Sequence, residues 1–145
     1  MHQEQSIQAQ LQRASALPEM LAVSFDAFEA IRLAARSCVD RVPELFAAFM
    51  TTIGAAVEGR EAITAAPSLP PGPAPLRPAL LEAGASVDDV IGVLAGLAAL
   101  LDARLTQAVA GTAIHADRLA CKQAAAAAQR ICQLMDRGED DAGLR

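Results

Sequence analysis

The chain has almost no aromatic bulk: it contains no tryptophan, no tyrosine and only four phenylalanines among 145 residues. It also has no stretch in which apolar and polar residues alternate, as they would in a half-buried strand. The residues that favour strands are few beside 34 alanines, and alanine has the highest helix propensity of all residues. We therefore predict an all-α fold, and the length fits one domain.

The sequence also has no long apolar run. The longest, residues 90–101, has twelve residues, whereas a membrane-spanning helix needs about 20. The first 15 residues are polar and lack the positive and then apolar segments of a secretory signal peptide. We predict a cytoplasmic protein with no transmembrane segment, and export by a route that needs no such signal stays open.

Positive charge is scarce, since the chain has a single lysine and a net charge of −5. Nucleic-acid binding relies on clustered cations that neutralise phosphates, so we expect no nucleic-acid partner. The last predicted helix carries one basic face, the candidate surface for an anionic partner, formed by Arg118, Lys122, Arg130 and Arg137. A solvated helix face explains these residues more simply. The preference for arginine over lysine is typical of bacterial proteins from GC-rich genomes.

The usual components of an active site are few. His115 is the one histidine in the region predicted to be folded, and no Glu-x-x-His pair, Cys/His zinc spacing or glycine-rich phosphate loop is present. Cys121 and Cys132 share a helix but lie about 16 Å apart along its axis, which is beyond the reach of a disulfide. We interpret them and Cys38 as buried thiols. The chain is predicted not to be an enzyme and to hold no metal or cofactor.

Proline is concentrated in one segment, residues 67–78, which holds six of the eight prolines. Such a composition excludes a helix, and twelve residues of polyproline II reach roughly 37 Å, longer than a 20-residue helix of about 30 Å. The segment is therefore predicted to be a crossover linker. Its PxxP spacings fit an SH3-like groove, but any proline-dense linker contains them, so a stiff spacer is the simpler interpretation.

Four long helices are predicted, in two helical hairpins joined by this linker. The first hairpin covers residues 18–66, with helices over about 18–39 and 43–63, and a polar amino-terminal segment, residues 1–17, that can also be helical. The second covers residues 79–138, with a short turn over 78–83 and helices over 87–110 and 113–137. Ser86 is the expected cap of the third helix. Residues 139–145 are predicted to be a disordered tail.

Small residues predict a close contact within the second hairpin. Gly92 and Gly96 lie on one side of the third helix, and glycine inside a helix costs about 1 kcal/mol relative to alanine, so a packing reason is expected. Ala99 and Ala103 continue that side. The opposite side is predicted to be buried: Val90, Leu94, Leu97, Leu101 and Leu105. The inward stripe of the last helix is Ala116, Ala120, Ala124, Ala127, Ile131, Leu134 and Met135, and that of the second helix is Phe46, Phe49, Met50, Ile53 and Val57.

An apolar seam with heptad spacing runs along the amino-terminal third of the chain. Its residues are the candidate interaction surface, because four helices leave more apolar surface than they bury: Ile7, Leu11, Leu21, Phe25, Phe28 and Val39. Burying six such side chains contributes roughly 9 kcal/mol before the cost of association. We predict a non-catalytic helical interaction protein, a homodimer or other homo-oligomer or a subunit or adaptor of a larger assembly. The alternatives are a helical bundle that binds a small apolar ligand or lipid, and an amphipathic coat on lipid or polymer granules.

Overall fold

The computed structural model describes the backbone of residues 2–71 and 84–143, and within these ranges the side chains of residues 7–71 and 84–136. The described residues form five α-helices: α1 (His2–Arg13), α2 (Leu17–Cys38), α3 (Phe46–Thr64), α4 (Val87–Gly111) and α5 (His115–Gly143). A short 3-10 turn, η1 (Pro43–Leu45), precedes α3. No strand occurs in these ranges, so the predicted all-α class is confirmed. The number of helices differs from the predicted four because α1 is separate.

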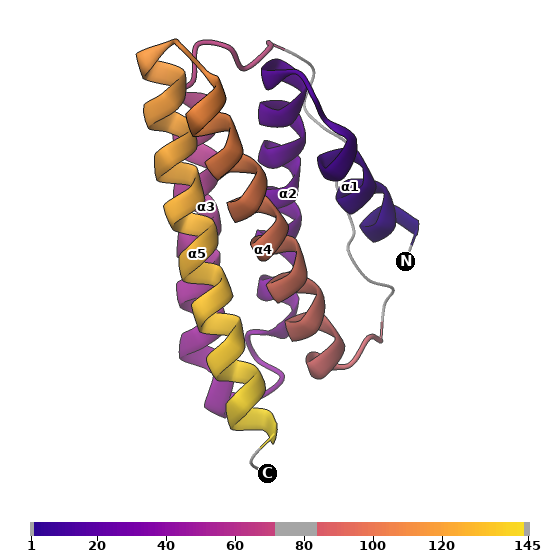
Figure 1. Ribbon diagram of the computed structural model, residues 1–145. Coiled ribbons are helices and arrows are strands. Elements are labelled where there is room, and N and C mark those ends of the chain that lie inside the picture. The colour runs from indigo at the N-terminus through magenta and orange to yellow at the C-terminus, as the bar shows by residue number, and fades with distance from the viewer. Residues whose placement is uncertain (1, 72–83, 144–145) are drawn as a thin grey trace.

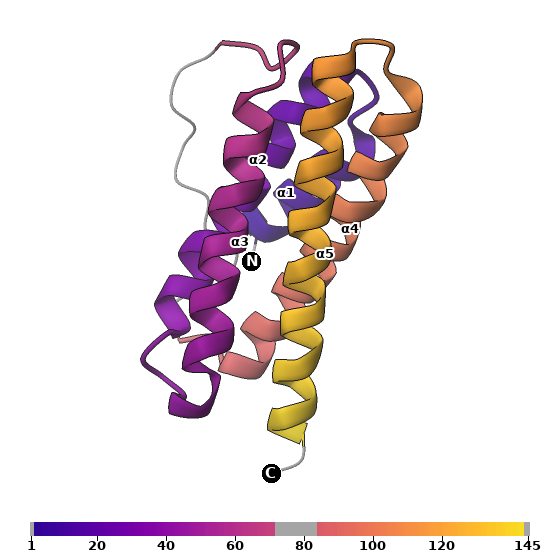
Figure 2. The same ribbon diagram turned by 90° about the vertical axis from the view of Figure 1, so that its left-hand side faces the viewer.

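The helices pack in layers (Figures 1 and 2). Helices α3 and α5 lie side by side and form one layer, α2 and α4 form the next, and α1 contacts both α2 and α4. Within the four-helix bundle each helix is antiparallel to the neighbours it contacts. The end of α3 and the start of α4 lie at opposite ends of the bundle (Figure 1), as the predicted crossover requires. Residues 72–83, which include most of the predicted linker and the predicted turn at 78–83, lie outside the described residues.

Pro18 separates α1 from α2. It occupies the first turn of α2, where its missing N–H needs no partner. The guanidinium of Arg104 on α4 donates to the carbonyl oxygen of Leu11 at 3.1 Å and to that of Ala14. These carbonyls belong to the carboxyl end of α1 and have no partner within the helix. Arg104 therefore caps α1 and fixes it to the α2–α4 layer.

The two hairpins expected from the sequence are present, and the bundle interior is apolar. The predicted inner side of α4, from Val90 to Leu105, is buried as expected. The alanine stripe of α5 is also buried, apart from Ala116, which is exposed, and Leu134, which is half-buried. The largest fully buried side chains are Phe28, Phe49, Leu11, Leu21, Ile31, Ile63, Ile91, Leu94, Leu97, Leu101, Leu105 and Ile131.

The predicted close crossing at Gly92 and Gly96 is wrong. Both glycines are exposed, and a Cβ added to either would meet no atom within 4 Å. Ala99 and Ala103 are exposed beside them. The reason is that α4 is apolar on both sides and the leucine side, which removes more area from water, takes the interior.

Two residues of α3 that were predicted to point into the core are exposed instead. Phe46 and Met50 are 47% and 44% exposed. Helix α3 instead buries the side that carries Phe49, Thr52, Ala55, Ala56, Gly59 and Ile63. Because α3 contacts α2 on one side and α5 on another, its buried stripe is centred between those two helices, and the side that carries Met50 faces outward.

The helix ends follow local signals in part. The hydroxyl oxygen of Ser86 accepts a hydrogen bond from the backbone N–H of Asp89 at 3.1 Å, so the predicted cap of α4 is confirmed. Helix α5 begins at His115 rather than at Ala113, and it continues to Gly143 beyond its predicted end. The part of the predicted tail that the structure describes, residues 139–143, is therefore helical, whereas residues 144–145 lie outside the described residues.

Glu29 of α2 links the two helices of the first hairpin by an ion pair. Its carboxylate accepts hydrogen bonds from Arg32 at 2.6 and 2.9 Å and from Arg60 of α3 at 2.6 Å. The hydrogen bond from Arg32 holds the pKa of Glu29 below its ordinary value, Arg60 adds to this effect, and burial opposes it. The folded chain therefore favours the ionised carboxylate.

We expect Glu29→Gln to lower the free energy of unfolding at pH 7 by about 0.5–1 kcal/mol, as for ion pairs near a surface. Since the pKa of Glu29 is lower in the folded than in the unfolded chain, this contribution is complete above the unfolded pKa and is lost as the pH falls through the folded pKa. Urea unfolding of wild type and variant should converge once the pH is well below about 4. A gap that stays constant into the acid range would contradict this assignment.

Candidate functional site

The seam predicted as the interaction surface is internal in this fold. Ile7, Leu11, Leu21, Phe28 and Val39 are buried, and Phe25 is half-buried against the same core. Their cover comes from the chain itself, because α1 packs on α2 and α4 and α2 packs on α3. A surface that contacts another protein in the folded state therefore has to be sought elsewhere.

Three residues of the basic face predicted on the last helix have described side chains, all three are exposed, and two of them have partners within the chain. Arg130 forms an ion pair with Glu58 of α3 at 2.7 Å, and Arg118 donates to the backbone oxygen of Thr112 at 3.0 Å. Lys122 is exposed and has no partner among the described residues. The side chain of Arg137 lies outside the described ones. Of the three described side chains, two therefore already have partners within the chain.

Cys38 and Cys121 are buried as the sequence predicted, whereas Cys132 is half-buried. Burial raises the pKa of the Cys121 thiol, and the nearby charge of Asp117 adds to the rise. Burial likewise raises the pKa of Cys132, with help from Asp102 and Asp136. A thiol with a raised pKa stays protonated at neutral pH and is a weak nucleophile.

In the described part of the chain, no group of three or more His, Cys, Asp and Glu side chains is arranged to hold a metal ion. None of the helices there combines the length and the apolar character needed to cross a membrane.

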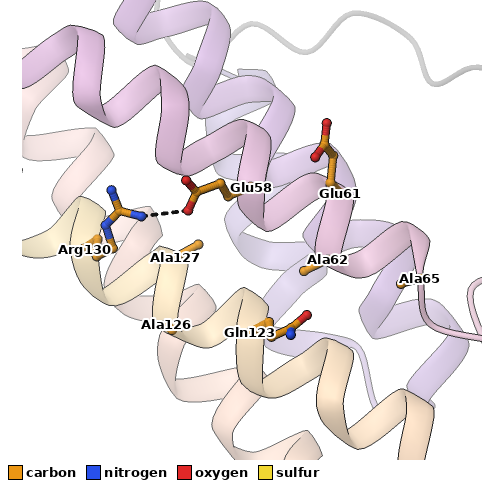
Figure 3. A pocket seen from close by; sticks show the side chains of 8 residues that line it. All are labelled: Glu58, Glu61, Ala62, Ala65, Gln123, Ala126, Ala127 and Arg130. Carbon is orange, nitrogen blue, oxygen red and sulfur yellow. Dashed lines mark hydrogen bonds and ion pairs between the residues drawn. The ribbon is translucent and has the colours of Figure 1, made fainter.

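A groove of about 510 Å³ runs between α3 and α5 (Figure 3). It is lined by Glu58, Glu61, Ala62 and Ala65 of α3 and by Gln123, Ala126, Ala127 and Arg130 of α5. Alanine occupies the positions where the two helices meet, so the backbones approach closely and the floor carries no long side chains. The groove is therefore smooth and apolar at its base and polar along its edges.

Charge is divided between the two edges of this groove. Glu58 and Arg130 point toward each other across it (Figure 3), and both side chains are about half exposed, so water screens this ion pair. Glu61 points away from α5 (Figure 3), and its carboxylate has no partner in the described part of the chain. The α3 edge thus carries an uncompensated acid, whereas the α5 edge carries the arginine.

The groove belongs to a larger exposed surface, which we call the α3–α5 face. Its residues recur at intervals of three and four along both helices: Ala47, Met50, Gly54, Glu58, Glu61 and Ala65 on α3, and Leu119, Gln123, Ala126, Arg130 and Gln133 on α5. Met50 and Leu119 are among the four large apolar side chains that are most exposed in the described chain. Both helices face the viewer in Figure 2 with no other helix over them.

Sequence reasoning assigned Met50 to the core, so it missed this surface. One signal was available. Helix α3 is apolar on two sides, one with Phe49 and Ile63 and the other with Phe46 and Met50. A helix that is apolar on two sides needs cover on both, and in the described part of the chain the side of α3 with Phe46 and Met50 stays exposed.

A second hollow of about 520 Å³ lies at the end of the bundle where α2 begins and α4 ends. Its walls include Leu17, Met20, Ala108 and Ile114, with Arg104 and Gln107 beside them. Arg104 also donates to the side-chain oxygen of Gln107 at 2.9 Å. Because this guanidinium already caps α1, it is not free to hold an anion on its own.

Comparison of the chain with protein-family models, with curated proteins and with solved structures found no match.

Proposed function

We propose that the chain is a non-catalytic helical interaction protein, acting as a homo-oligomer or as a subunit or adaptor of a larger assembly, and that the α3–α5 face is its contact surface. The observation that carries this proposal is the exposure of Met50 and Leu119 on one helix pair with an alanine-floored groove between them. Cytoplasmic location and bacterial origin remain predictions from the composition.

The chemistry of this face suits protein contact. Burying the exposed halves of Met50 and Leu119 contributes about 1 kcal/mol each. Eight of the eleven residues of this face are uncharged, and its three charged residues, Glu58, Glu61 and Arg130, lie along the edges of the groove. Small residues at Gly54, Ala65 and Ala126 allow another helix to approach closely.

The substitution Ala126→Arg is expected to abolish association, because it places a long charged side chain in the middle of the face. Sedimentation velocity from about 1 to 200 µM, a range that covers micromolar dissociation constants, should give wild type a mass above the 15.0 kDa of one chain and return the variant to one chain. Ala99→Arg is the matched control, since Ala99 is an exposed alanine on the outer side of α4.

A larger assembly is tested in parallel by affinity purification of the tagged chain from its native cells. A protein partner of wild type should be retained by Ala99→Arg and lost with Ala126→Arg. A single-chain mass at all concentrations, together with no partner that distinguishes the two variants, would refute the proposal.

A second candidate function is the binding of a small apolar ligand or lipid at the hollow beside Ile114. The observation that favours it is the exposure of Ile114, which is 50%, at the rim of a hollow with mainly apolar walls. Native mass spectrometry of the purified chain separates the two candidates, because a ligand adds a small mass that Ile114→Glu removes, whereas association multiplies the mass of the chain.

A further inference from the structure

We propose that the α3–α5 face docks a second copy of this chain about a two-fold axis that runs parallel to the bundle, so that α3 of each protomer lies against α5 of its partner. This inference rests on the proposed function and names the partner. Its basis is the division of charge across the face: Glu58 and Glu61 lie on α3, and Arg130 lies on α5. A two-fold contact that exchanges the two helices makes this surface complementary to itself.

The levels of these residues along the bundle agree with such pairing. The ion pair at 2.7 Å places Glu58 and Arg130 at the same level. Glu61 is three residues further along α3, about 4.5 Å at the helical rise of 1.5 Å per residue. A two-fold axis parallel to the bundle leaves the position of each residue along the bundle unchanged. Along that direction, Glu61 of one protomer and Arg130 of its partner therefore differ by less than one helical turn. Arg130 then lies between Glu58 of its own chain and Glu61 of the other.

The other face-to-face arrangement is disfavoured by the same charges. A two-fold axis perpendicular to the helices places α3 against α3, and where that axis passes at the level of the groove, Glu58 and Glu61 of each protomer meet the same acids of the partner. Like charges at close range cost free energy and disfavour that pairing. Charge thus selects the orientation, while the alanine floor and the side chains of Met50 and Leu119 provide the contact area.

The test exchanges charges between the two edges. Glu61→Arg places a base on α3 opposite Arg130 of the partner, and Arg130→Glu places an acid on α5 opposite Glu61 of the partner. Sedimentation equilibrium should show each variant alone dissociating at a concentration about tenfold or more above that of wild type. An equimolar mixture should regain wild-type affinity, because both contacts between unlike protomers are then complementary. The chain with both substitutions should recover in the same way.

Matched controls use charges that lie off the face. Glu19→Arg and Arg36→Glu change exposed residues of α2 and should leave association unchanged, alone or mixed. Thermal unfolding by circular dichroism checks that every variant folds. Little loss is expected even for Arg130→Glu, since the ion pair with Glu58 is exposed to water.

The outcomes separate this inference from the proposed function. If wild type forms dimers that neither charge substitution weakens, or that Glu61→Arg strengthens, the two-fold pairing of α3 with α5 is overturned while an interaction protein remains. If wild type stays a single chain at about 200 µM, a second copy is not the partner, and the affinity purification with Ala126→Arg decides the proposed function by itself.

Discussion

Replacing Asp117 with alanine is expected to lower the free energy of unfolding by about 3 kcal/mol. Asp117 is fully buried, and its two carboxylate oxygens accept hydrogen bonds from the backbone N–H of Ser68 at 3.0 Å and from the Ser68 hydroxyl at 2.5 Å. These bonds attach the segment after α3 to the first turn of α5. Removal of the carboxylate leaves both Ser68 donors without their acceptor in a partly buried position.

Urea unfolding followed by circular dichroism measures the loss, which corresponds to a fall in Tm of roughly 6–12 °C for a chain of this size. Ser68→Ala is the graded control, because it removes the hydroxyl and keeps the backbone donor, and it should cost about 1 kcal/mol. If Asp117→Ala is no more destabilising than Ser68→Ala, the carboxylate does not anchor this segment.

The hydrogen bonds between Ser68 and Asp117 are contacts that could not be predicted from the sequence. Local signals located most helices: Pro18 begins α2, Ser86 caps α4, and the proline-rich segment separates the two hairpins. These features depend on residues a few positions apart. Ser68 and Asp117 are 49 positions apart, and nothing in their immediate surroundings marks them as partners. Pairings of this kind depend on how the hairpins pack.

The orientation of the helices about their own axes was predictable only where one side is clearly more apolar. The alanine stripe of α5 was placed correctly for this reason, apart from Ala116 and Leu134. Helix α4 is apolar on both sides, and the close contact was assigned to its glycine side although its leucine side is the buried one. Helix α3 has large apolar residues on two sides, so periodicity alone does not decide between Phe49 and Met50 for the core. The same ambiguity concealed the α3–α5 face, since its position depends on which side of α3 turns inward.

A close helix crossing was predicted on α4, but it occurs between α3 and α2, at Gly59. A Cβ added to Gly59 would overlap the ring of Phe28 on α2 along one edge of that ring. Phe28 is fully buried, so its ring has little room to move away. Alanine at this position gains up to about 1 kcal/mol of helix propensity and loses about 3 kcal/mol by overpacking, the upper end of the usual range. We expect Gly59→Ala to lower the free energy of unfolding by about 2 kcal/mol.

Gly96→Ala is the matched control, with the same substitution inside a helix where nothing lies near the added methyl group. It should raise the free energy of unfolding by about 0.5–1 kcal/mol, so one chemical change is expected to act with opposite signs at the two sites. A double-mutant cycle with Phe28→Leu locates the cause, because the smaller side chain makes room for the methyl group and the combined loss should be less than the sum of the single losses. Additive losses would show that Gly59 is required for a reason other than its contact with Phe28. A destabilising Gly96→Ala would show that a neighbouring element packs closely against α4 at Gly96.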